Sequence, residues 1–221
     1  INPMQGLTKN TEKVFRAVSI LSCLKDYILI GGTALSLQIN KRKSEDLDFC
    51  IWPKKLKNDK PTVNWPAIER ELETVGKIGS RDVLGFDHVN FVVSVQRITF
   101  DSKQENLSPV KTPVAILNNI NAADISAIGA MKIELILRRS EFRDYYDIYS
   151  ILQEGISLKD IVNAAVKYSN HRLKTRDALA FLSNGSNFKT DKSFALSEPV
   201  YNVDHKGIEE YIKSAIRKEY I

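Results

Sequence analysis

The sequence predicts an α+β protein, with a sheet in the first half of the chain and helices alone in the second. Short apolar or alternating runs typical of strands occur at residues 27–30, 46–51, 89–93 and 97–101. From residue 121 onward, apolar residues recur every three or four positions, which is the period of a helix with one buried face. We therefore expect two domains, residues 1–118 and 119–221.

Composition describes an ordinary globular protein of moderate size. The 221 residues are 43% hydrophobic and 27% charged, enough to build a core. No apolar run approaches the length of a membrane span, and no signal peptide is expected, so we predict a cytoplasmic protein without a membrane partner. Cys23 and Cys50 are predicted to be reduced core thiols. The net charge of +5 is compatible with a nucleic-acid partner but does not require one.

The first elements are an amphipathic helix and a strand that runs into a glycine turn. Residues 8–25 place Val14, Val18 and Leu21 on one stripe. After the apolar strand 27–30, Gly31 and Gly32 allow a tight turn, and Thr33 is placed to cap the next helix. Backbone N–H groups at such a helix start can bind phosphate.

Two acids follow in the next predicted strand. Asp46 and Asp48 are two residues apart, so both carboxylates should point to one face while Leu47 and Phe49 point to the other. Like charges this close repel, and a bound divalent cation is the usual relief. A phosphate-binding turn beside a metal-binding pair suits chemistry on a nucleoside triphosphate.

Later residues complete the predicted sheet. The proline-bounded basic segment 53–61 is predicted to be a loop, either a solubilising one or a flap that contacts phosphate. A helix is expected at 64–75. In the alternating strand 97–101, Asp101 lies on the opposite face from Ile98 and Phe100. It is our candidate for a third acid, although an acid at a strand's exit turn explains it equally well.

The second half should contain only helices. Residues 107–120 form a proline-containing bridge with a short strand at 114–117, and Asn121 can cap the helix that follows. A helix begins near Arg143, and further helices are expected at 157–168, 171–183 and 206–219. The three histidines lack cysteine or histidine partners at ligand spacing, so no zinc site is predicted.

A second set of charged residues lies at 130–149. Asp144 and Asp147 are three residues apart and therefore neighbours on one helical face, with Lys132 and Arg143 nearby in sequence. The residues themselves are explained most simply by an ion-pair network that joins two helices.

Together, these motifs resemble a known family. The ordered set of apolar strand, Gly31-Gly32-Thr33, helix, Arg42, Ser44 and Asp46-Leu47-Asp48-Phe49 resembles the signature of the AbiEii/AbiGii toxin nucleotidyltransferases. This MenT-like family belongs to the DNA polymerase β-like superfamily. Lys132, Arg143, Asp144 and Asp147 fall on the marked positions of its second signature. One departure is Lys41, where the family often has histidine.

The resemblance implies a polymerase β-like nucleotidyltransferase domain with a small mixed sheet, followed by an α-helical C-terminal domain. It implies transfer of a nucleoside monophosphate from an NTP, with two Mg²⁺ ions on Asp46 and Asp48 and a third ligand near Asp101. It further implies that Gly31, Gly32, Thr33 and Arg42 bind the nucleotide, and that Lys132 and Asp144 take part in catalysis.

The acceptor remains open at this point. By resemblance it is tRNA, and the setting is a toxin–antitoxin or phage-defence pair with a cognate antitoxin as partner. A small-molecule or protein acceptor is an alternative, and so is an inactive nucleotidyltransferase-like binding module. Metal-dependent NTP binding separates the last of these from an enzyme.

Overall fold

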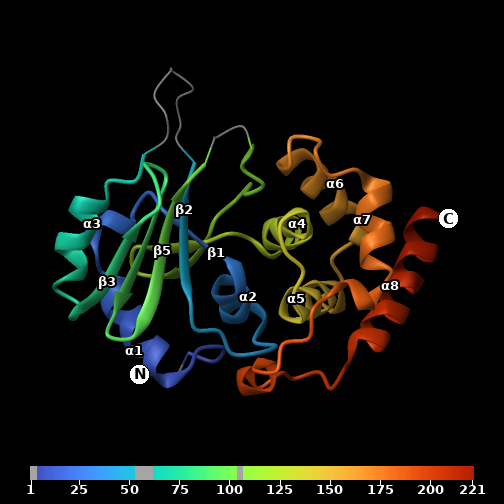
Figure 1. Ribbon diagram of the computed structural model, residues 1–221, viewed down its shortest axis with the longest axis horizontal. Coiled ribbons are helices and arrows are strands. Elements are labelled where there is room, and N and C mark those ends of the chain that lie inside the picture. The colour runs from blue at the N-terminus through green and yellow to red at the C-terminus, as the bar shows by residue number, and fades with distance from the viewer. Residues whose placement is uncertain (1–3, 53–61, 104–106) are drawn as a thin grey trace. The chain divides into compact units, whose positions relative to one another are not determined.

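A computed structural model describes residues 4–52, 62–103 and 107–221 (Figure 1). The chain divides into two compact units, Ile1–Asp124 and Ile125–Ile221. The division follows the last strand of the sheet, a few residues beyond the predicted boundary at 118. The predicted basic loop 53–61 lies outside the described residues.

Seven strands of the first unit form one sheet within the described residues, in the order β3-β4-β5-β2-β1-β7-β6. Their bounds are β1 Ile28–Ile30, β2 Leu47–Ile51, β3 Ile78–Val83, β4 His88–Val93, β5 Gln96–Ser102, β6 Val114–Leu117 and β7 Ile120–Ala122. The sheet is mixed, because β1 is antiparallel to β2 and parallel to β7, while β2 is parallel to β5. The predicted α+β class with a mixed sheet is confirmed.

One face of the sheet is an apolar core. Leu47 and Phe49 of β2 are buried on it, and Phe49 stacks on Phe100 of β5 with ring centroids 5.5 Å apart. Helix α1 (Lys9–Val18) contributes its own buried stripe, and α3 (Trp65–Leu72) buries Ile68 and Leu72. The opposite face of the same strands carries the polar side chains of β2 and β5, because side chains alternate along a strand.

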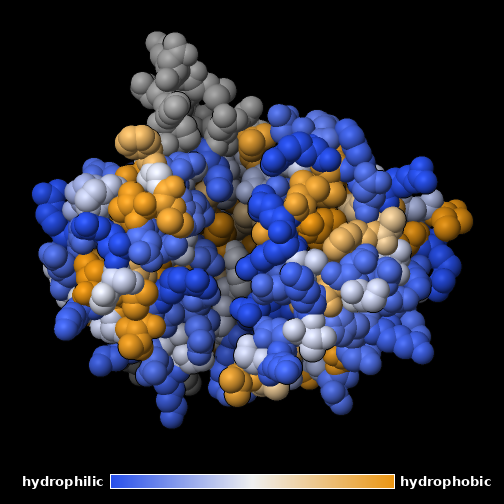
Figure 2. Space-filling view, in the orientation of Figure 1, coloured by the Kyte–Doolittle hydropathy of each residue, from blue (hydrophilic) through white to orange (hydrophobic). Residues whose placement is uncertain are grey.

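The far edge of the sheet is exposed. Strand β3 is open to solvent along most of its length, and the β3–β4 connection exposes Leu84 and Phe86. Figure 2 shows hydrophobic side chains gathered on this side of the first unit.

The second unit contains helices and short 3₁₀ turns in the residues that the structure describes. Its helices are α4 Ile125–Glu134, α5 Phe142–Gln153, α6 Leu158–Tyr168, α7 Thr175–Leu182 and α8 His205–Tyr220. Gly129 lets α4 approach α6 closely, since a Cβ there would lie 3.1 Å from Ile161 Cγ2. Tyr145 of α5 stacks on Phe188 with centroids 4.0 Å apart. None of the described helices combines the length and the apolar composition needed to cross a membrane.

Three local predictions were wrong. The predicted helix 8–25 ends at Val18, and a 3₁₀ turn at Ser22–Leu24 follows. Thr33 does not cap the second helix, because α2 (Gly31–Ile39) already begins at Gly31. Asn121 does not cap a helix either. It lies in β7 and pairs with Ile28 of β1, which a single sequence could not reveal because the partner is about ninety residues away.

Candidate active site

The acidic pair stands at the start of β2. Asp48 lies within the strand, and Asp46 immediately precedes it. Alternation puts both carboxylates on the polar face, as predicted, with Leu47 and Phe49 in the core. In register, Asp48 pairs with Ile30 of β1 on one side and with Thr99 of β5 on the other. The pair is therefore held by the centre of the sheet rather than by a loose loop.

The environment of Asp48 opposes its negative charge. Burial and, second, the charge of Asp46 raise the pKa of Asp48, while a hydrogen bond from Thr99 and the charge of Arg97 act in the other direction. A divalent cation would relieve this repulsion, because hard cations take carboxylate oxygens as ligands. The two carboxylates therefore fit a magnesium ion.

The glycine turn lies directly against this pair. Gly31 has φ +75°, a conformation that L side chains rarely adopt. A Cβ added to it would lie 3.0 Å from Asp48 Oδ2. A Cβ on Gly32 would lie 2.6 Å from Nη2 of Arg42. Both glycines are thus needed for the close approach of the first turn of α2 to the acidic strand and to Arg42.

Hydrogen bonds tie α2 to the loop that carries the acids. Although Thr33 does not cap the helix, its buried hydroxyl bonds to the backbone carbonyl of Asp46 and lies 2.9 Å from Ser44 Oγ. Arg42 is buried and donates from Nη1 to the carbonyl of Lys43 at 3.0 Å. The structure therefore brings together the first predicted set, Gly31, Gly32, Thr33, Arg42, Asp46 and Asp48.

Asp101 lies two residues after Thr99 in β5. It shares the polar face, but its direct neighbours in register are Cys50 of β2 and His88 of β4. Its carboxylate contacts His88 Nδ1, and Lys103 Nζ is 4.0 Å away. Across the residues that the structure describes, no group of three or more His, Cys, Asp or Glu side chains is arranged to hold a metal ion. The charge of Asp101 also raises the pKa of Asp48, and its role as a third metal ligand stays a prediction.

Three residues beside the acids were missed by sequence reasoning. Arg97 pairs with Asp46 at 2.7 Å, Thr99 hydrogen-bonds to Asp48, and Gln96 donates from Nε2 to the carbonyl of Glu45. The signal was present in the alternation of strand 97–101, which puts Arg97 and Thr99 on the same face as Asp101.

The second charged set forms a buried ion trio inside the second unit. Lys132 Nζ of α4 is 2.8 Å from Asp144 Oδ1 and 2.8 Å from Asp147 Oδ2, both on α5. The three side chains are only 7%, 2% and 2% exposed. Arg139 adds a longer contact of 3.5 Å to Asp144. The trio joins two helices, as the simpler interpretation of the sequence predicted.

Arg143, which directly precedes Asp144 in α5, pairs with two other acids. Its guanidinium pairs with Asp191 at 2.8 Å and with Glu141 at 3.1 Å. One of these partners, Glu141, directly precedes α5, and the other, Asp191, lies on the segment that follows α7.

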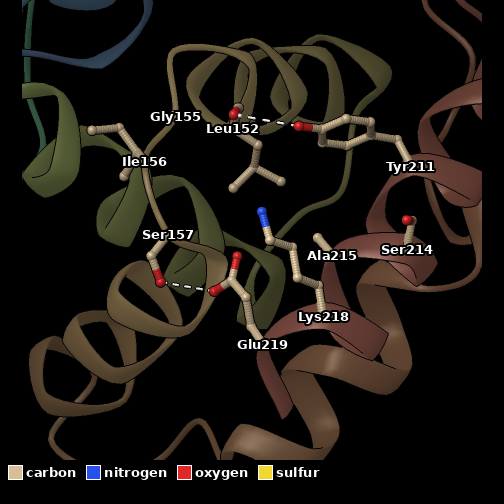
Figure 3. A pocket seen from close by; sticks show the side chains of 9 residues that line it. All are labelled: Leu152, Gly155, Ile156, Ser157, Tyr211, Ser214, Ala215, Lys218 and Glu219. Atoms are coloured by element: carbon tan, nitrogen blue, oxygen red, sulfur yellow. Dashed lines mark hydrogen bonds between the residues drawn. The ribbon is translucent and has the colours of Figure 1, made fainter. Parts of the chain in front are cut away.

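A cavity of about 540 Å³ also lies in the second unit (Figure 3). Its lining includes Leu152 at the end of α5, Ser157 before α6, and Lys218 and Glu219 in the last turn of α8. Glu219 accepts hydrogen bonds from Ser157 Oγ and from the backbone N–H of Lys159, both at 2.7 Å. It therefore caps the start of α6, and none of the predicted site residues lines this cavity.

Comparison with known proteins agrees with this geometry. A family model described as nucleotidyl transferase AbiEii toxin, type IV toxin–antitoxin system, matches residues 15–210. An uncharacterized protein of Aquifex aeolicus is 26% identical over 165 residues, which cover 72% of this chain and 73% of that protein.

Two solved structures are also similar. MenT4, a nucleotidyltransferase toxin from Mycobacterium tuberculosis, aligns over 95% of this chain and 86% of its own, with 13% identity and a TM-score of 0.57, which shows a shared fold. The polyadenylate synthase of Megavirus aligns over 64% of this chain and 31% of its own, with 14% identity and a TM-score of 0.45.

Fold and site together define a nucleotidyltransferase. The match over most of its length shows that the chain belongs to the AbiEii family of nucleotidyltransferase toxins. The resemblance seen in the sequence is confirmed.

Proposed function

We propose that this chain is the magnesium-dependent toxin of a toxin–antitoxin or phage-defence pair, and that it transfers a nucleoside monophosphate from an NTP to tRNA. One observation carries the catalytic part. The structure of the first unit packs Gly31 and Gly32 of α2 against Asp48 and Arg42, so a helix start that can take phosphate adjoins two carboxylates that can take metal.

The reaction follows from these groups. The oxygen of an acceptor hydroxyl attacks the α-phosphorus of the NTP and loses its proton to water, while the bond from the α-phosphorus to the bridging oxygen breaks and releases pyrophosphate. Asp46 and Asp48 would hold Mg²⁺, which polarises the phosphates and favours ionisation of the hydroxyl. The N–H groups at the start of α2 would bind phosphate oxygens, and Arg42 would offset their charge.

For the second unit, the family resemblance alone suggests that Lys132 and Asp144 take part in catalysis. The 2.8 Å ion pair supports a positioning role for Asp144, which holds the lysine ammonium. The acceptor and the antitoxin are proposed from the family alone.

Transfer of label to RNA tests the proposal. The protein is incubated with each α-³²P-labelled NTP, Mg²⁺ and total tRNA, and the RNA is separated by gel electrophoresis. We expect label in tRNA with the wild type and none with Asp48→Asn. Arg81→Gln, which changes the outer strand β3, serves as the matched control and should keep activity.

Separate acceptor pools distinguish the alternatives. Label that appears only in protein or in small molecules would keep the enzyme but replace tRNA as the acceptor. Absence of label in every pool, together with no Mg²⁺-dependent binding of NTP in calorimetry, would refute the proposal in favour of an inactive binding module.

A further inference from the structure

Arg97 occupies Asp46, one of the two carboxylates proposed to hold metal. Its Nη2 is 2.7 Å from Asp46 Oδ2, and its Nε is 3.3 Å from Asp46 Oδ1, so the guanidinium covers both oxygens. A carboxylate held in this way has its lone pairs directed at the arginine. Metal and arginine therefore compete for the same oxygens.

The chain positions this contact from both sides. In the parallel register of β2 and β5, Leu47 pairs with Ile98, so the preceding residues Asp46 and Arg97 are also neighbours. Buried Gln96 donates to the carbonyl of Glu45, and the hydroxyl of Thr11 donates to Gln96 Oε1 at 3.0 Å.

A tight turn immediately precedes this anchor. The β4–β5 turn consists of Ser94 and Val95, both with positive φ (47° and 67°). Positive φ is uncommon for a β-branched residue and indicates a turn held by its surroundings. The start of β5, and with it the backbone of Arg97, is thus fixed.

The head group of Arg97 is nevertheless exposed to solvent. Its side chain is 58% exposed, and Asp46 is 38% exposed. Exposed ion pairs of this kind contribute little free energy, so a divalent cation can displace the arginine. A displaced guanidinium would remain on the polar face beside the acids, with five donors suited to phosphate oxygens.

We propose that Arg97 is an exchangeable counter-cation: it holds Asp46 while metal is absent, leaves it when Mg²⁺ binds, and then contacts the phosphates of the NTP. This rests on the proposed function. It makes Arg97 a nucleotide-binding residue that also restrains metal binding in the absence of nucleotide.

Two binding measurements on the full chain test the idea without any turnover. Affinity for Mn²⁺ alone is measured by EPR, and affinity for Mg²⁺–tripolyphosphate is measured by calorimetry, because tripolyphosphate is common to all NTPs. In Arg97→Gln we expect Mn²⁺ to bind about two- to fivefold more tightly, since an exposed competing ion pair is gone. Tripolyphosphate should bind about tenfold more weakly, since a charge-assisted contact is lost.

Matched variants separate this from a general change in charge. Arg81→Gln removes an arginine that pairs with Glu69 at 2.7 Å and stacks on Trp65, on the opposite face of the sheet. It should leave both affinities unchanged. Arg97→Lys keeps the charge without the fork and should restore part of the tripolyphosphate affinity.

Three outcomes would overturn the inference. Unchanged or weaker Mn²⁺ binding in Arg97→Gln would mean that Arg97 does not compete with metal. Unchanged tripolyphosphate binding would mean that it does not reach phosphate, and equal effects in Arg81→Gln would mean that only net charge matters. The proposed function survives all three, whereas failure of the wild type to bind Mn²⁺ at all would overturn both.

Discussion

Replacing Lys132 by methionine should destabilise the second unit by about 3–5 kcal/mol, the usual cost of removing one partner from a buried ion pair. The lysine ammonium is 2.8 Å from both Asp144 and Asp147, and all three side chains are nearly inaccessible. Methionine fills most of the same volume without a charge. The two carboxylates would then stay buried without their shared cation, and repel each other.

Two optical probes separate this effect from the rest of the chain. Both tryptophans, Trp52 and Trp65, belong to the first unit, so their fluorescence reports on that unit. Circular dichroism at 222 nm reports mainly on helices, most of which lie in the second unit. With a urea m-value of about 2 kcal/mol/M, the dichroism midpoint should fall by about 1.5–2.5 M. The fluorescence transition provides the internal reference.

Neutralising the acids provides the control. Adding Asp144→Asn and Asp147→Asn to Lys132→Met should recover most of the lost stability, because neutral amides do not require a cation. A cost below about 1 kcal/mol for Lys132→Met, the value of a solvated pair, would refute the reasoning. So would a triple variant no more stable than the single one.

Three further predictions concern the first unit. Burial and the charge of Asp46 raise the pKa of Asp48. Protonated Asp48 therefore favours the folded state, and the stability of the protein falls as pH rises through the raised pKa. Asp48→Asn should therefore stabilise the metal-free protein at pH 7 by about 0.5–2 kcal/mol, and this gain should vanish below the ordinary pKa of 3.8. Urea unfolding at pH 7 and below pH 3.8 measures the difference. Destabilisation by Asp48→Asn at pH 7 would contradict the prediction. Gly31→Ala should cost about 1–2 kcal/mol in tryptophan-monitored melts, because the residue has φ +75° and its Cβ would press on Asp48; a neutral effect would show that α2 can shift. Burial raises the pKa of Cys23 to about 12 and also raises the pKa of Cys50. Both thiols should therefore react slowly with Ellman's reagent at pH 8 in the native protein and rapidly once urea unfolds it. A fast reaction in the native protein would show that the thiolates are exposed.

The local geometry from Gly31 to Asp48 was predictable because these residues are close in sequence. Gly31 to Asp48 span one strand, one helix and the start of the next strand, so strand alternation and glycine conformation define most of their geometry. Even here, the cap at Thr33 was misplaced. A hydroxyl near a helix start predicts a cap, but the side chain instead bonds to the loop that carries Asp46.

The remaining contacts depend on strand pairing that one sequence does not show. Arg97 and Thr99 meet the acids only because β5 is parallel to β2, and Asp101 faces His88 because β4 is its other neighbour. A register shift of two residues decides whether Asp101 or Thr99 lies beside Asp48. The sequence indicated the ion pairs between Lys132 and the acids of α5, but only the packing of α4 on α5 shows that the ammonium is buried.

The central position of β1 has a consequence for how the chain folds. This three-residue strand lies between β2 and β7, and β7 arrives about ninety residues later in the chain. Long-range parallel pairing forms slowly, because the entropy of closing a long loop is lost before its contacts form. During synthesis the glycine turn and the acidic strand can therefore form early as a local antiparallel pair, while the sheet that holds them rigid closes only after Ile120–Ala122 has left the ribosome.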